Sequence, residues 1–200
     1  EYPQHWAFIA PKRPPVPETP LEGFKAETTT PIDRFVAARL AAEKLSPSPP
    51  ADPAALIRRV TLDLTWLPPE QAAMDALLRA ANQGSAVFDQ YYTRYVEKLL
   101  ASPQYGERWA RKWLDLARYA DTNGYEKDRA RQIWPWRDWV VRALNADMPF
   151  DEFTIEQLAG DTLRNATAQQ TTATVFHRNS MLNEEGGIDP LEFRFHAMND

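Results

Sequence analysis

Ionisable side chains gather in one short polar segment, residues 121–131, which lies between two aromatic segments. Aspartate and glutamate beside arginine and lysine could bind a polar substrate, and polar loops positioned by rigid helices are frequent functional sites. Tryptophans that follow the segment could stack on a sugar ring. An ion-pair network that joins two helices explains the same residues without a ligand. The candidates are Asp121, Asn123, Glu126 and Arg129 for a polar site, and Trp134 and Trp136 for substrate stacking.

A second polar cluster occupies residues 177–190, around two consecutive glycines. Its oxygen-bearing side chains suit a hard cation such as calcium, and the glycines permit a tight turn. The spacing does not match an EF-hand loop, and acidic residues beside a helix N-terminus explain the pattern without a metal. The candidates are His177, Arg178, Asn183, Glu184 and Glu185 for the polar site, and Glu184, Glu185 and Asp189 for metal binding.

A third pattern places Glu192, His196 and Asp200 at four-residue spacing, on one face of a predicted helix. A carboxylate and an imidazole at this spacing could bind a metal, so His196 joins the metal candidates. A solvated helix face predicts the same spacing. The sequence contains no nucleophile elbow, phosphate-binding loop or dinucleotide fingerprint.

Composition excludes several functional classes. A net charge of -5 argues against nucleic-acid binding, which favours a basic surface. No segment approaches the roughly 20 apolar residues that span a bilayer. The chain has no cysteine, which excludes disulfides, a thiol nucleophile and covalent c-type haem attachment within these residues.

Apolar residues recur with helical periodicity from residue 30 onward, and no segment alternates as a β-strand would. We therefore predict an all-α fold: an irregular multi-helix domain in residues 31–200, preceded by a proline-rich extended arm in residues 1–30. The last helix has no stop signal before Asp200, so we expect the domain to continue beyond it. Helix starts are predicted at Thr30 with Asp33, at Asp52, at Ser102, at Asp151, and at Thr167 with Gln170.

Apolar stripes predict which helix faces are buried. Phe150 and Ile155 have the spacing of a hydrophobic staple, and Gly160 is expected to end their helix. We expect the arm to be docked through His5, Trp6, Phe8 and Ile9, and a mobile linker from a preceding domain is the alternative. The predicted core stripes include Ile32, Phe35, Val36 and Leu40, then Phe88, Tyr91, Tyr92, Tyr95, Val96 and Leu99, and then Trp109, Trp113, Leu116 and Ala120.

Six longer segments occur in one order along nearly the whole chain. They are HWAFIAPKRPPVP, PIDRFVAARL, LIRRVTLDLTWLPP, LLASPQYGERWARKWLDLARYADTNGYEKD, DMPFDEFTIEQLAGD and FHRNSMLNEEGGIDPLEFR. Together they resemble the planctomycete-type cytochrome-c-associated proteins. In that family a domain of unknown function follows an N-terminal cytochrome c module and precedes a further uncharacterised domain.

The resemblance implies a periplasmic or extracellular protein with c-type haem as its redox group. In the family, a Cys-x-x-Cys-His motif follows the region that matches EEGGIDPLEFR, so the haem would be attached outside these 200 residues. The leading hypothesis is the helical N-terminal part of an extracytoplasmic c-type haem protein. It would pack against a haem-bearing segment of the same polypeptide or of another chain. It would shape a redox or substrate site, as in a haem-dependent oxidoreductase. The alternatives are a module that binds or processes polysaccharide, and a non-catalytic interaction scaffold.

Overall fold

A computed structural model describes residues 5–19, 30–124, 127–181 and 189–199. Within these ranges the chain forms helices and no strand, apart from one isolated bridge between Thr122 and Ala130, which confirms the all-α prediction. Contacts divide the chain into two units, Glu1–Ala51 and Asp52–Asp200. The first unit therefore includes the first long helix as well as the predicted arm, and the assignment of residues 1–30 as an arm and 31–200 as a domain stays a prediction.

The first unit contains η1 (Trp6–Phe8) and α1 (Pro31–Ala42). Thr30 Oγ1 accepts the Asp33 N–H at 3.3 Å, and the Asp33 carboxylate accepts the Thr30 N–H at 2.6 Å. This reciprocal capping box satisfies two N–H groups that the helix itself leaves unpaired, so α1 begins where the sequence predicts.

Burial in the first unit differs from the prediction. Ile32 is 72% exposed and Val36 is 45% exposed, whereas the small Ala37 is buried. Trp6 and Phe8 are both 78% exposed within this unit, and the docking of the arm stays a prediction. The apolar pattern of α1 correctly marks a helix but not a buried face.

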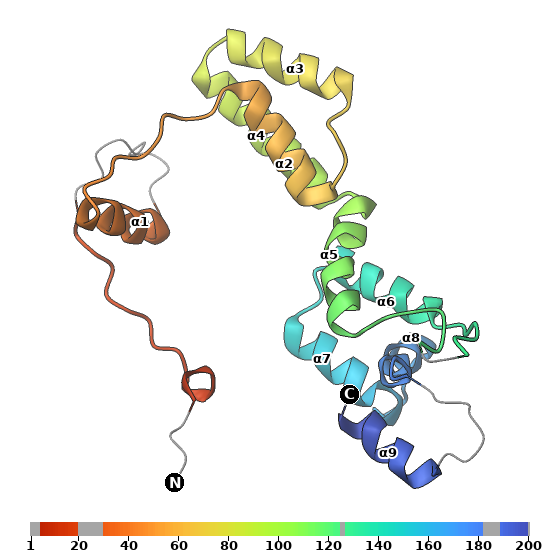
Figure 1. The fold of residues 1–200 in the computed structure, drawn as a ribbon. Helices are drawn as coiled ribbons and strands as arrows, with labels where there is room; N and C mark the ends of the chain where they lie inside the picture. Colours follow the sequence, from red (N-terminus) through yellow and green to blue (C-terminus); the bar gives the residue numbers. More distant parts are fainter. Residues whose placement is uncertain (1–4, 20–29, 125–126, 182–188, 200) are drawn as a thin grey trace. The chain divides into compact units, whose positions relative to one another are not determined.

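The second unit begins with α2 (Pro53–Thr65), α3 (Gln71–Asn82) and α4 (Ser85–Leu100), which pack together as Figure 1 shows. Asp52 accepts the Ala55 N–H at 3.0 Å and starts α2 as predicted. Ile57, Leu77 and Phe88 are buried at the centre of this group. Tyr91 is 46% exposed, so the predicted stripe of α4 is only partly buried.

The helices that follow α4, except the last, form a second group around another core (Figure 1). Trp136 and Val140 are fully buried there, and Trp139 stacks on Phe153 with ring centroids 5.2 Å apart. The elements of this group are α5 (Pro103–Leu116), α6 (Trp134–Asn145), α7 (Phe150–Ala159), η3 (Gly160–Thr162), α8 (Ala168–Ala173) and η4 (Thr174–Arg178). The last helix, α9 (Pro190–Asn199), contributes no described residue to this core.

Helices α5 and α6 pack closely because α5 presents small residues to α6. A Cβ atom at Gly106 would lie 2.5 Å from the backbone oxygen of Val141, so only glycine fits this crossing. Asn145 fixes it from α6, because its side chain accepts the Gly106 N–H at 2.8 Å and donates to the Pro103 carbonyl at 3.1 Å. Ala110, one turn after Gly106, is 1% exposed.

The predicted core stripe of α5 is therefore wrong in two ways. Trp109 is 36% exposed and Leu116 is 78% exposed, because the Gly106 side of the helix faces α6. The helix also ends at Leu116, so Ala120 is not part of it. Arg118 ends the turn with a φ of 53°, and the Tyr119 N–H returns to the Leu114 carbonyl at 2.9 Å.

Two of the predicted helix starts are also corrected. α7 begins at Phe150 with Pro149 before it, so Asp151 lies in the first turn, where its charge complements the helix dipole, and is not the cap. Phe150 is 71% exposed and Ile155 is 50% exposed, which leaves no buried staple. α5 starts after Ser102 as predicted, but the Ser102 hydroxyl donates to the Leu99 carbonyl instead of capping the helix.

Two other predicted helix boundaries are confirmed. Gly160 is the C-cap of α7, and the chain continues there as η3. Thr167 and Gln170 form the predicted capping box of α8, since the Thr167 hydroxyl accepts the Gln170 N–H at 3.2 Å.

Candidate functional site

The polar segment between α5 and α6 folds back on itself, and its two ends run antiparallel to each other. The Asn123 N–H donates to the Arg129 carbonyl and the Arg131 N–H donates to the Asp121 carbonyl, both at 2.9 Å. At the turn, the Gly124 N–H donates to the Asp128 carboxylate at 2.8 Å. Backbone hydrogen bonds and the Asp128 carboxylate therefore hold the described part of this segment together.

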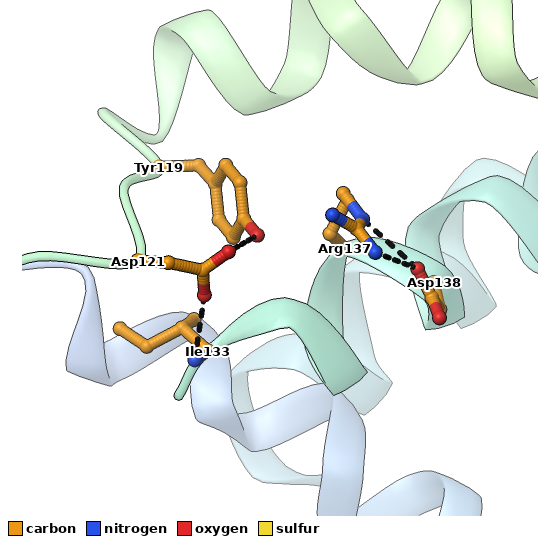
Figure 2. A network of polar contacts seen from close by, with 5 residues as sticks. All are labelled: Tyr119, Asp121, Ile133, Arg137 and Asp138. Carbon is orange, nitrogen blue, oxygen red and sulfur yellow. Dashed lines mark hydrogen bonds and ion pairs between the residues drawn. The ribbon is translucent and has the colours of Figure 1, made fainter. Parts of the chain in front are cut away.

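Asp121 connects the end of α5 to the start of α6. Its carboxylate accepts the Tyr119 hydroxyl at 2.5 Å and the Ile133 N–H at 2.9 Å, as Figure 2 shows. Burial acts to raise the pKa of Asp121. The hydrogen bonds from Tyr119 and from the Ile133 and Trp134 N–H groups lower this pKa by a larger amount, so the net shift is downward. Burial, aided by the bond to Asp121, raises the pKa of Tyr119 to about 12.

Arg131 joins this polar segment to the chain that follows η4. Its guanidinium donates to the Ser180 carbonyl at 2.8 Å and to the Asn179 carbonyl at 3.1 Å. Nearby, a Cβ atom at Gly124 would lie 3.4 Å from Met181 Cγ. The polar segment thus contacts residues 179–181, which directly precede the acidic, glycine-containing segment that the sequence singled out.

An apolar groove of about 280 Å³ lies beside this contact. A second groove of about 340 Å³ shares its Trp113 and Leu116 walls and extends to Phe150. We call Trp109, Trp113 and Leu116, with the two grooves that they line, the apolar side of α5. Besides the shared walls, the first groove is lined by Ala117, Arg118, Phe176, His177, Asn179, Ser180, Met181 and Ala197.

Three hydrogen bonds fix the walls of the first groove. The Trp113 indole N–H donates to Gln157 Oε1 at 2.8 Å, and Gln157 is 2% exposed. His177 Nε2 lies 3.1 Å from the Leu158 carbonyl oxygen, which orients the imidazole. Asn179 is 6% exposed and donates to the Phe176 carbonyl, while its buried Oδ1 has no hydrogen-bond partner among the described residues.

The structure brings some of the sequence candidates together and separates others. Asp121 takes part in the polar contacts described above, and Asn123 is 5% exposed within the same segment. Arg129 and Arg178 are exposed, and neither lines the apolar grooves. Glu126, Asn183, Glu184 and Glu185 lie outside the described residues.

The two stacking candidates differ sharply in exposure. Trp136 is 0% exposed, so no face of its indole is open to a sugar ring, whereas Trp134 is 48% exposed. A stacking role for Trp134, and with it polysaccharide binding, stays a prediction.

The metal candidates occupy structural positions where they are described. Asp189 accepts the Leu191 N–H at 2.9 Å and thereby starts α9, and His196 Nε2 lies 3.7 Å from Glu192 Oε1. Within the described ranges, no group of three or more His, Asp or Glu side chains could hold a metal ion. Calcium binding that involves Glu184 and Glu185 therefore stays a prediction.

Sequence reasoning missed three residues that organise this region: Tyr119, Arg131 and Met181. The contact between Tyr119 and Asp121 could have been predicted from their two-residue spacing. No local pattern identifies the contact of Arg131 with Ser180, because 49 positions separate these residues.

No helix in the described part of the chain is both long and apolar enough to cross a membrane. A family model described as PSCyt2, a protein of unknown function (DUF1549), matches residues 31–200. Neither the curated proteins nor the solved structures contain a match to the chain. The matched region includes the polar segment, the apolar grooves and every helix from α1 to α9.

Proposed function

Since the chain belongs to the PSCyt2 family, which is associated with planctomycete cytochrome c modules, we propose that it packs against a c-type haem-bearing segment. The segment belongs to the same polypeptide or to another chain, and this chain forms one wall of the redox site. The haem is attached outside these residues, because they include no cysteine. Covalent haem attachment of this kind places the protein in the periplasm or outside the cell.

The apolar side of α5 is the observation that carries this proposal. Leu116 is 78% exposed and Phe150 is 71% exposed, and both line one groove. Contiguous exposed apolar surface beside a groove is typical of an interaction site. A haem-bearing segment supplies the apolar surface that would cover it.

The residues of the first groove fit the edge of a haem group. Trp113, Leu116 and Phe176 form apolar walls, and His177 and Met181 carry ligand atoms of the types that bind haem iron. When bound, haem supplies one-electron transfer. The apolar walls exclude water from its edge, and exclusion of water favours the reduced, less charged state of the iron.

Optical spectroscopy of the intact protein tests the proposal. Haem staining, a Soret band and an α band are expected after purification from the native source. Absence of all three would overturn the proposal, because the apolar side of α5 would then have another partner.

A charge placed on the apolar side tests the location of the haem. Leu116→Glu in the intact haem protein should lower the midpoint potential, because a nearby carboxylate stabilises the oxidised iron. Leu100→Glu is the matched control, since Leu100 is also exposed, at 44%, and lines neither groove of the apolar side. Equal shifts in both variants, or no shift in Leu116→Glu, would show that the haem lies elsewhere.

A further inference from the structure

The opposite side of α5 carries a different groove, which runs along α6. Its volume is about 500 Å³, and its floor is formed by Ala110, Leu114 and Val141. We call it the arginine groove, because Arg111 from α5 and Arg137 and Arg142 from α6 line it. Two carboxylates, Glu107 and Asp138, complete its lining.

The arginines of this groove differ in their partners. Arg137 donates through Nε at 2.9 Å and through a terminal nitrogen at 2.8 Å to one oxygen of Asp138, as Figure 2 shows. This pair neutralises Asp138 and fixes the Arg137 guanidinium. Arg111 and Arg142 form no ion pair with any carboxylate in the described part of the chain. Two guanidinium groups in the groove therefore lack a counterion.

Arg111 is nevertheless held in position. Its guanidinium carbon lies 4.5 Å from the centroid of the Trp66 ring, and the guanidinium carbon of Arg108 lies 4.3 Å from the same ring. The buried Nε of Arg108 has no hydrogen-bond partner within the described residues. Two like charges on one indole repel each other, so a bound anion nearby would stabilise this arrangement.

We propose that the arginine groove binds a phosphate or sulfate ester. The oxyanion lies among Arg111, Arg137 and Arg142, because the planar guanidinium fork matches the oxygen geometry of such groups. The organic part of the ligand lies on the apolar floor, since the groove is much larger than the ion alone. Glu107 is the one carboxylate of the lining that no arginine neutralises, and it opposes the anion.

Equilibrium titration of the full chain with inorganic phosphate and with phenyl phosphate tests this site. Both ligands should bind saturably, and phenyl phosphate should bind more tightly because its ring contacts the floor. Arg142→Gln should weaken binding of both by at least about tenfold, the effect of losing a charge-assisted hydrogen bond. Glu107→Gln should strengthen binding, because it removes the opposing charge.

Arg79→Gln is the matched control, since Arg79 is exposed on α3, away from the groove lining. Arg142 is exposed as well, so its variant is expected to fold, and a thermal melt verifies this. Arg142→Lys keeps the positive charge but loses the planar guanidinium group. Its affinity for both ligands should lie between those of the unsubstituted protein and of Arg142→Gln.

Absence of saturable binding, or equal weakening by Arg79→Gln, would overturn the proposed site. Equal affinity for the two ligands would overturn the assignment of an ester. The titration involves no haem, so its outcome is independent of the proposed function.

Discussion

The two sides of α5 differ in polarity, one being apolar and the other rich in arginine, although both belong to one helix of 14 residues. The apolar side exposes Leu116 beside indole walls. The arginine groove, in contrast, holds guanidinium groups above a small apolar floor. The first surface suits a large apolar partner, and the second suits a small charged ligand.

The difference between the two sides follows from the residues that lie between them. Gly106 and Ala110 face α6 and bring the two helix backbones together. Because this seam has no large side chain, the large residues of α5 must project to either side of it. The small residues thus decide which surfaces stay open, while the large residues decide what those surfaces bind.

The strongest test of this comparison removes the seam that both sides share. Gly106→Val should destabilise the fold by at least about 3 kcal/mol, because its Cβ would lie 2.5 Å from the Val141 backbone oxygen. A melting temperature lower by about 6–12 °C is expected. Phosphate binding should weaken as well, because the arginine groove spans both helices.

Ala86→Val is the control for this change, since Ala86 is exposed in α4 and should cost only about 0.5 kcal/mol. Similar stabilities for the two variants would show that the backbones do not meet at Gly106.

A second change should disturb the apolar side alone. Trp113→Phe removes the indole donor and leaves Oε1 of the buried Gln157 without its partner, which should cost about 2 kcal/mol. Phenyl phosphate affinity should stay unchanged. Trp109→Phe serves as the control, because Trp109 is 36% exposed and its substitution should cost less. Denaturant unfolding and ligand titration together measure both effects, and a loss of ligand affinity would contradict the independence of the two sides.

The polar contact at the end of α5 should appear in the pH dependence of stability. The pKa of Tyr119 is raised from 10.0 to about 12 in the folded protein, so its contribution is complete below pH 10 and is lost as pH rises to 12. Tyr119→Phe should cost about 1 kcal/mol at neutral pH and should lack this alkaline loss. Urea unfolding at stepped pH measures both, and an unchanged alkaline loss in the variant would assign it to another group.

Asp121 should contribute in the acidic range. Its pKa is lowered in the fold, so its contribution is complete above pH 3.8 and is lost as pH falls through the lowered value.

The smallest effect is expected at the most exposed position of the apolar side. Leu116→Ser should change the free energy of unfolding by less than about 0.5 kcal/mol, because Leu116 is 78% exposed. Thermal or denaturant unfolding checks this value. A loss above 2 kcal/mol would show that Leu116 packs inside the fold, and the apolar side would then have little surface for a partner.

Helix starts were predictable wherever a short side chain caps the helix within three or four residues. Thr30 with Asp33, Asp52, and Thr167 with Gln170 form the expected bonds. Asp151 is an aspartate, like Asp52, but it is not a cap. The helix α7 already begins at Phe150, and Pro149 occupies the cap position. Residue type therefore identifies a cap only where the residue itself has the extended backbone of an N-cap, as Thr30, Asp52 and Thr167 have.

Candidate site residues were predictable as a polar segment, but their roles were not. Asp121 was identified by its charge, whereas its role in joining Tyr119 to the Ile133 N–H depends on how the segment folds back. Trp134 and Trp136 look equivalent in sequence, yet one is half-exposed and the other is fully buried. A difference of two residues on a helix turns the side chain to another face, and only the packing partner decides which face is inside.

The sequence by itself determined the all-α class, several helix termini and the lack of a haem-attaching cysteine, because these depend on composition and on bonds between near neighbours. Only the tertiary structure decided which side of α5 is closed. That choice depends on Gly106 meeting Val141, a contact between two helices that no local pattern encodes. Once that contact is made, the apolar side and the arginine groove are both left open on α5.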